Sequence, residues 1–340
     1  MSELRRRLIW RTVIAVGLGG AGLAGLLAAI VGLTDAAQGM AEASPKLLAA
    51  GVGAFSVGTA LAGLRFRSLL PTEGPKVPAR VLVQLFFAAN ALNIVLPGPA
   101  GDLALAAVLD RRHGLPVETG IAVGLHARLV GLLVTGLLAV GVALALPTSA
   151  VLGQAVTLGV LALGVVGTLA AGVAFRPRPL ARVSAAMAQQ WSSWNKVHAR
   201  VERVVWALEA VSAQGWRAML AAAGWSLLIQ GFMFCTLVAT CAAAGMTVPL
   251  SGLLLTHAAA GVAAVGAVIL PAGGAGGYEL AFVTVLSASS PLSVAAASAV
   301  VVLVRMVQLS CIGLSSAVLL AMVPEMLVEP SERMQPGTNV

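Results

Sequence analysis

Long runs of apolar residues, separated by short polar clusters, extend through most of the chain. An α-helix needs about 20 predominantly apolar residues to cross the hydrocarbon core of a bilayer. Six runs reach this length: 10–33, 47–64, 117–146, 151–174, 216–244 and 292–323. The pattern therefore predicts an all-α, polytopic integral membrane protein with six spanning helices.

Two further apolar runs, 81–109 and 251–287, are interrupted in the middle by clusters of proline and glycine. The interruptions read LPGPAG at Leu96–Gly101 and LPAGGAGG at Leu270–Gly277. Such clusters remove helical hydrogen bonds and end or unwind a helix. Each run is thus predicted to form two short helices instead of one long helix.

Basic residues decide how these broken runs sit in the membrane, because cytoplasmic loops are enriched in Lys and Arg. Four basic residues precede 81–109 and two follow it: Arg65, Arg67, Lys76, Arg80, Arg111 and Arg112. With both flanks in the cytoplasm, this run is predicted to be a re-entrant hairpin whose two limbs meet near the middle of the bilayer. The run 251–287 is interpreted in the same way, and both chain termini are then expected on the cytoplasmic side of the cell membrane.

The amino-acid composition excludes an ordinary soluble protein. Of the 340 residues, 59% are hydrophobic and 10% are charged, with a mean hydropathy of +0.96, whereas soluble proteins carry about 25% charged residues. The net charge of +8 does not indicate nucleic-acid binding, because the basic residues lie in clusters between apolar runs. The first run also exceeds the roughly 7–15 apolar residues of a signal peptide, so we expect a retained helix.

The connection 175–215 contains the longest polar stretch outside the apolar runs. Apolar residues recur there every three or four positions from Trp194 to Val211, next to a basic stripe of Lys196, Arg200 and Arg203. This spacing predicts an amphipathic cytoplasmic helix over 181–215. It could lie on an anionic leaflet, anchored by Trp191 and Trp206, or pack against the protein's own cytoplasmic face.

The two broken runs also indicate an internal repeat. Asp102 follows the first break and Arg128 comes 26 residues later, while Glu279 follows the second break and Arg305 again comes 26 residues later. Each half, 1–146 and 147–324, then holds three spanning helices and one hairpin, followed by a cytoplasmic tail at 325–340. Because three is odd, the second half is predicted to be inverted relative to the first, as in many secondary transporters.

Arg128 and Arg305 are the candidate functional charges, because an arginine in the middle of a spanning helix costs about 2.5–3.5 kcal/mol and normally faces a partner or a water-filled cavity. Asp102 and Glu279 are the expected partners, and the two pairs could either pin the hairpins or bind a substrate. Helix N-termini at glycine-rich tips present free N–H groups to an anion such as phosphate. The candidate substrate-binding residues are Arg128, Arg305, Asp102, Glu279, Asn90, Asn93, Gly98, Gly101, Gly276 and Gly277.

Other polar residues carry weaker signals. His126 and His257 lie close to these positions, but a packing role is the more common one for such histidines. GLGGAG at 17–22 lies inside an apolar run, where close helix packing explains it better than nucleotide binding. The three cysteines indicate neither a disulfide framework nor a metal site. No nucleotide, metal or nucleophile motif is found in the sequence, so we expect no cofactor and no enzymatic activity.

The segment NIVLPGPAGDLALAAVLDRRHGLP (93–116), with HARL (126–129), resembles the lysylphosphatidylglycerol synthase transmembrane family, as do LPAGGAGGYELAFVTVL (270–286) and LVRM (303–306). The family usually has Gly-Glu where this chain has Gly101-Asp102, and Glu-Arg where it has Ala127-Arg128. The resemblance implies a flippase-like protein that moves a membrane lipid between leaflets. With no soluble synthase domain after Val323, a stand-alone member is expected.

Together these patterns lead to the hypothesis of a lipid flippase for an anionic or phosphate-bearing lipid. Three alternatives stay open: a polyprenyl-phosphate carrier, a membrane-embedded enzyme of lipid modification, and a scaffold that recruits a separate lipid-modifying enzyme through the 181–215 helix. The expected partner is a membrane lipid with an anionic headgroup and not a nucleic acid, and a homodimer is compatible with the sequence.

Overall fold

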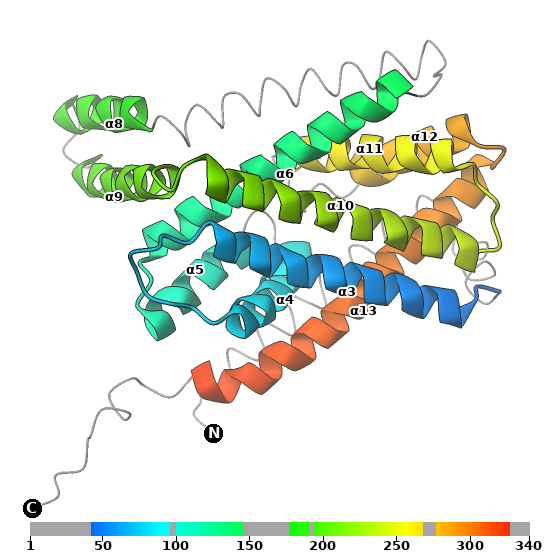
Figure 1. Ribbon diagram of the computed structural model, residues 1–340, viewed down its shortest axis with the longest axis horizontal. Helices are drawn as coiled ribbons and strands as arrows, with labels where there is room; N and C mark the ends of the chain where they lie inside the picture. The colour runs from blue at the N-terminus through cyan, green and yellow to red at the C-terminus, as the bar shows by residue number, and fades with distance from the viewer. Residues whose placement is uncertain (1–41, 96–99, 146–176, 191–193, 268–276, 327–340) are drawn as a thin grey trace, which may run out of the picture.

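The computed structural model describes residues 42–95, 100–145, 177–190, 194–267 and 277–326, and every regular element in these ranges is an α-helix (Figure 1). The helices, in chain order, are α3 (Pro45–Ser68), α4 (Ala79–Val95), α5 (Ala100–His113), α6 (Val117–Ala145), α8 (Arg178–Gln190), α9 (Asn195–Ser212), α10 (Trp216–Ala243), α11 (Leu250–Ala267), α12 (Gly277–Ser289) and α13 (Val294–Met326).

Four of these helices are long and apolar enough to cross a membrane. The qualifying segments are Pro45–Ser68, Val117–Val142, Trp216–Ala243 and Val294–Cys311, which lie in α3, α6, α10 and α13. They coincide with four of the six apolar runs expected to span. The other two runs, 10–33 and 151–174, lie outside the described residues. The described part of the chain is therefore that of a multi-pass helical membrane protein.

Helices α3 and α10 form a long antiparallel pair at the centre of the molecule (Figure 1). At one end of the pair, the Ser44 N–H donates to the Ala243 carbonyl oxygen over 2.9 Å. At the other end, the Gln214 side-chain amide donates to the Leu69 carbonyl oxygen over 2.6 Å. These two contacts show that the end of each helix lies beside the start of the other.

The two interrupted runs each form a pair of short antiparallel helices, α4–α5 and α11–α12. Helix α4 begins shortly after α3 ends, and α11 begins shortly after α10 ends. Because α3 and α10 are antiparallel, the two hairpins enter the helix bundle from opposite ends, as Figure 1 shows. Helix α13 packs against α4, and α6 packs in the equivalent way against α11.

Small residues let the limbs of the first hairpin approach closely. A Cβ atom added to Gly101 in α5 would collide with the Ala89 carbonyl oxygen of α4 and lie 2.8 Å from Oδ1 of Asn93. A Cβ atom on Gly120 in α6 would lie 2.8 Å from Cβ of Ala106 in α5. Glycine at these two positions therefore allows α5 to pack in direct contact with α4 and with α6.

The hydrophobic core is divided between the two hairpins. One cluster joins the first hairpin to α3, α6, α9 and the start of α10, with Phe66, Leu82, Leu109 and Leu208 among its buried members. A second cluster joins the other hairpin to α13 and the end of α10, and includes Phe282. Each hairpin is therefore anchored in its own apolar cluster.

The single amphipathic helix expected over 181–215 is instead two helices, α8 and α9, that pack against each other. The apolar face of α9 is buried against the protein itself, with Ala207, Leu208 and Val211 in the first core cluster. Arg203 of α9 is paired with Glu118 at the start of α6 over 2.7 Å. This favours the alternative in which the helix packs on the protein's own face, while Trp206 stays 71% exposed.

Candidate functional site

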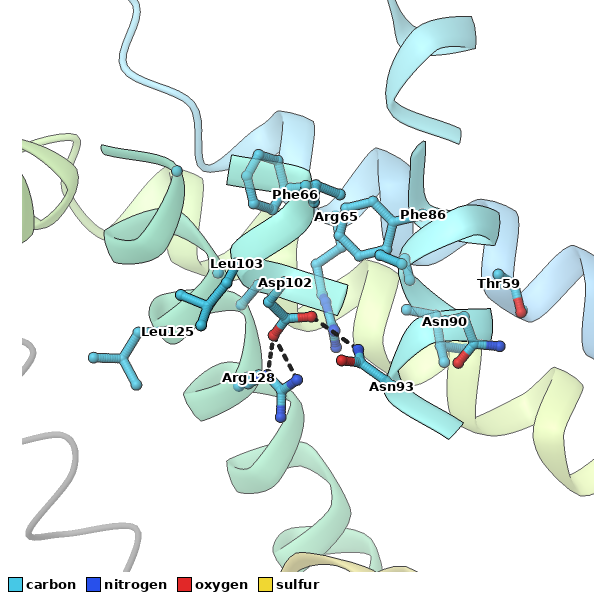
Figure 2. Close-up of a pocket in the computed structure, with 18 of the residues that line it drawn as sticks. Thr59, Arg65, Phe66, Phe86, Asn90, Asn93, Asp102, Leu103, Leu125 and Arg128 are labelled. Atoms are coloured by element: carbon cyan, nitrogen blue, oxygen red, sulfur yellow. Dashed lines mark hydrogen bonds and ion pairs between the residues drawn. The ribbon is translucent and has the colours of Figure 1, made fainter. Parts of the chain in front are cut away.

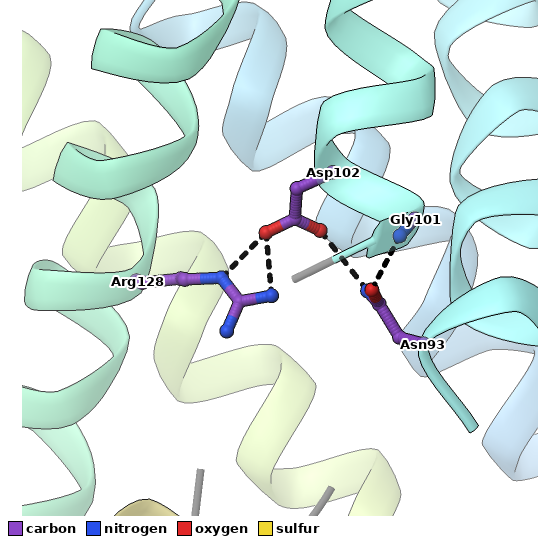
Figure 3. A network of polar contacts seen from close by, with 4 residues as sticks. All are labelled: Asn93, Gly101, Asp102 and Arg128. Atoms are coloured by element: carbon purple, nitrogen blue, oxygen red, sulfur yellow. Dashed lines mark hydrogen bonds and ion pairs between the residues drawn. The ribbon is translucent and has the colours of Figure 1, made fainter. Parts of the chain in front are cut away.

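Asp102 lies in the first turn of α5, at the inner end of the first hairpin. Asn93, near the end of α4, holds this turn through both atoms of its side-chain amide (Figure 3). Its Oδ1 accepts a hydrogen bond from the Gly101 N–H over 2.8 Å, and its Nδ2 donates to Oδ1 of Asp102 over 3.0 Å. The amide thereby satisfies a free N–H at the start of α5 and orients the carboxylate.

Arg128, from the first half of α6, binds the other oxygen of the same carboxylate. Its Nε and Nη2 both donate to Oδ2 of Asp102, over 2.6 and 2.5 Å. Nη1 forms no hydrogen bond with any residue that the structure describes. The side chains remain 38% exposed for Arg128 and 31% for Asp102, so this ion pair is accessible to a ligand.

The pair faces an open cavity of about 530 Å³ that is lined by residues of α3, α4, α5, α6 and α10. Figure 2 shows Arg65, Asn93, Asp102 and Arg128 close together, with Asn90 and Thr59 farther away along the cavity. These polar residues are Thr59, Arg65, Asn90, Asn93, Asp102 and Arg128. The rest of the lining is apolar and includes Phe66, Phe86, Leu103 and Leu125. A few convergent polar groups in an otherwise apolar concavity are typical of a ligand-binding site.

The second acid–arginine pair is buried. Arg305 of α13 donates from Nε to Oε1 of Glu279 over 2.7 Å, and its Nη2 is ion-paired with the same oxygen. Its Nη1 donates to Oε1 of Gln308 over 2.7 Å, and its guanidinium lies over the Tyr278 ring at 4.6 Å. Glu279 is 1% exposed and Arg305 is 18% exposed. All three guanidinium nitrogens therefore have protein partners.

A smaller cavity of about 160 Å³ adjoins this second pair, but neither Glu279 nor Arg305 lines it. Its polar lining comes from Gln230, Thr236, His257, Tyr278 and Gln308. Oε1 of Gln230 accepts a hydrogen bond from Nε2 of His257 over 3.1 Å, and Nε2 of Gln230 donates to Oγ1 of Thr135 over 2.5 Å. Phe55 and Met233 line both cavities and form the wall between them.

The structure thus separates the residues singled out in the sequence into two groups. Asn90, Asn93, Asp102 and Arg128 line the larger cavity, next to Gly101. Glu279 and Arg305 form a separate buried pair beside the smaller one, and Gly277 begins α12. Gly98 and Gly276 lie outside the described residues. Of the two histidines, His126 packs α6 against Ser212 at the end of α9, and His257 lines the smaller cavity.

Sequence reasoning missed one charged residue of the cavity, Arg65. The sequence groups it with Arg67 as part of a basic cluster that follows a spanning helix. Instead its side chain turns into the larger cavity, and Nη1 donates to Oγ of Ser226 in α10 over 3.1 Å. No local sequence signal separates Arg65 from Arg67, because Ser226 lies 161 residues further along the chain.

Fold and site together define a multi-pass helical membrane protein with a charged, partly exposed site between its helices. The chain belongs to the family described as the lysylphosphatidylglycerol synthase TM region, which it matches over residues 9–326. Its function is therefore related to membrane lipids.

A curated relative is similar over most of this chain. The protein named glycosyltransferase AglD, from Haloferax volcanii, is 29% identical over 332 residues, which cover 88% of this chain and 53% of the relative. The chain thus spans about half the length of that protein. No solved structure matches the chain.

Proposed function

We propose that this protein moves a lipid with an anionic, phosphate-bearing headgroup between the leaflets of the cell membrane. The headgroup binds at Asp102 and Arg128, and the acyl chains stay among the lipids. The observation that carries this proposal is the accessible ion pair in a largely apolar cavity of about 530 Å³. An ionisable pair at such a position marks a substrate pathway more often than a stabilising contact.

The proposed architecture has six spanning helices and two re-entrant hairpins, arranged as an inverted repeat of residues 1–146 and 147–324. The opposite entry of the two hairpins supports it (Figure 1). So does the matching packing of α13 on α4 and of α6 on α11. In secondary transporters with inverted repeats, discontinuous helices form the binding site near the middle of the membrane.

Transport in this account is a rocking of the two halves that moves the headgroup past the wall between the cavities. Phe55 and Met233 line that wall on both sides. Met233 is unbranched and flexible, so its side chain can move at little energetic cost. No covalent step is required, and we propose that the chain acts as a carrier and not as an enzyme.

The proposed orientation places the basic end of the molecule in the cytoplasm, together with both termini. Arg111 and Arg112 end α5 at the same end of the bundle where Arg203 of α9 pairs with Glu118. Arg178 of α8 and Glu209 of α9 are paired nearby over 2.8 Å. Lys and Arg accumulate on the cytoplasmic side of membrane proteins, which supports this orientation in the cell membrane.

The test is transport of fluorescent phosphatidylglycerol by the full chain in proteoliposomes, measured by quenching of the outer leaflet with an impermeant reductant. The wild-type protein should expose the inner-leaflet probe to the reductant, and Arg128→Gln should slow this at least tenfold. Arg203→Gln, an exposed arginine outside the cavity, is the matched control and should transport normally. Wild-type transport by folded Arg128→Gln protein would overturn the proposal.

A second candidate is a carrier of polyprenyl phosphate, or a membrane partner of a separate lipid-modifying enzyme. It is favoured by the similarity to a protein named glycosyltransferase that is about twice as long as the matched region. Polyprenyl phosphate added to the same liposomes distinguishes the candidates. Strong competition with phosphatidylglycerol would favour the polyprenyl carrier, whereas absence of competition would favour the phospholipid.

A further inference from the structure

Arg65 adds a third charged group to the cavity that already holds Asp102 and Arg128. Figure 2 shows its side chain extending from α3 toward Asn93 and the Asp102 carboxylate. Its Nη1 donates to Ser226, while its Nε is buried without a hydrogen-bond partner in the described structure. A buried donor without an acceptor costs free energy, the more so when it carries charge.

The position of Arg65 depends on two neighbouring helices. A Cβ atom on Gly131, almost one turn after Arg128 in α6, would lie 2.7 Å from Nη1 of Arg65. Glycine at this position therefore leaves the space that the guanidinium occupies. Ser226 of α10 binds the same nitrogen and itself donates to the Ala222 carbonyl oxygen over 2.8 Å. The two contacts hold the guanidinium next to the cavity.

The charges in the cavity do not balance. Asp102 is bound by Arg128 and Asn93, and no described carboxylate forms an ion pair with Arg65. The charges of Arg128 and Asp102 nevertheless act on Arg65. Two guanidiniums and one carboxylate leave one excess positive charge among the described lining residues. In surroundings of low dielectric constant, an excess charge of this kind strongly favours an anionic ligand.

We propose that Arg65 is a headgroup ligand that acts together with Arg128, and that the site prefers a singly charged phosphodiester over a doubly charged phosphomonoester. This rests on the proposed function. One negative charge neutralises the cavity, whereas a second would leave it negative. The planar guanidinium has several donors in a fixed arrangement that suits phosphate oxygens, which a lysine ammonium does not reproduce.

Arg65→Gln and Arg65→Lys test the role of the residue. Binding is measured with the full chain in phosphate-free detergent micelles, by the anisotropy of fluorescent phosphatidylglycerol. A hydrogen bond to a charged group contributes about 1.5–3 kcal/mol, so Arg65→Gln should weaken binding about tenfold or more. Arg65→Lys should retain part of the affinity. Exposed Arg67 lies on the same helix, and Arg67→Gln is the control that should bind normally.

A thermal melt separates this role from a structural one. Because Arg65 has no carboxylate partner to leave behind, Arg65→Gln should unfold at the wild-type temperature or above it. Normal binding by Arg65→Gln, with binding lost in Arg128→Gln, would overturn this inference and leave the proposed function intact. Normal binding by both variants would overturn both. Tighter binding of phosphatidic acid than of phosphatidylglycerol would overturn the preference for a single charge.

Discussion

The two acid–arginine pairs have the same spacing along the chain but different surroundings. Asp102 and Arg128 are 31% and 38% exposed in a cavity of about 530 Å³, and Nη1 of Arg128 has no hydrogen bond to a described residue. Glu279 is 1% exposed, and all three nitrogens of Arg305 are bonded to protein. Equal spacing therefore produces an accessible pair in one half and an enclosed pair in the other.

The sequence left two roles open for these pairs, pinning a hairpin or binding a substrate. The difference in exposure favours a different role for each pair. A pair that pins a hairpin should be enclosed, with its donors satisfied, as Glu279 and Arg305 are. A pair that binds a ligand must keep donors accessible, as Arg128 does. We therefore propose ligand binding for the first pair and hairpin anchoring for the second.

The largest loss of stability is expected when one partner of the buried Glu279–Arg305 pair is replaced and the other is kept. Glu279→Leu leaves the Arg305 guanidinium buried without its carboxylate, which typically costs about 3–5 kcal/mol. Asp102→Asn, at the exposed pair, should cost about 1 kcal/mol because cavity water can solvate Arg128. Thermal unfolding of both proteins in detergent measures the difference. Equal losses of stability would contradict the assignment of distinct roles.

A smaller loss is expected where the limbs of the first hairpin touch. Gly101→Ala would place a methyl group against the Ala89 carbonyl oxygen, and overpacking of this kind costs about 1–3 kcal/mol. Gly136→Ala is the control, because a Cβ atom there has no neighbour within 4 Å. The unfolding temperature should fall only for Gly101→Ala. An unchanged value for Gly101→Ala would mean that the hairpin limbs can separate freely.

The last expected effect is mainly on transport and lies at Asn93, whose replacement should lower stability no more than Gly101→Ala does. Asn93→Ala removes two hydrogen bonds that orient Asp102, each contributing about 0.5–1.5 kcal/mol, and transport should fall several-fold. Asn90→Ala, which alters the same cavity at a residue with no hydrogen bond to a described side chain, is the matched comparison. If Asn90→Ala slowed transport as much as Asn93→Ala, the slower transport of Asn93→Ala could not be attributed to lost orientation of Asp102.

The sequence was sufficient for the helices but not for the environment of the charges. Apolar run length predicts α3, α6, α10 and α13, and proline with glycine predicts the breaks that separate α4 from α5 and α11 from α12. The 3–4 spacing also predicts the buried face of α9. The helix predicted over 181–215 is wrong at its start, because that spacing begins at Trp194 and does not cover the residues of α8.

Exposure of a charge depends on neighbours that are distant in the chain. Arg65, unlike the exposed Arg67, lies beside Ser226 and Gly131, which leave a place for its guanidinium. Arg305 differs from Arg128 because Gln308 and Tyr278 complete its contacts. Spacing alone carries no information on such tertiary contacts.

The most direct test compares transport by two doubly substituted proteins in which each pair is removed as a unit. Removal of both charges avoids leaving an unpaired partner, and replacing a buried pair with apolar residues of similar size is often neutral for stability. Asp102→Asn with Arg128→Gln should abolish transport of fluorescent phosphatidylglycerol in proteoliposomes. Glu279→Leu with Arg305→Met should retain at least half of the wild-type rate. The reverse result, from two proteins that are both folded, would contradict the account.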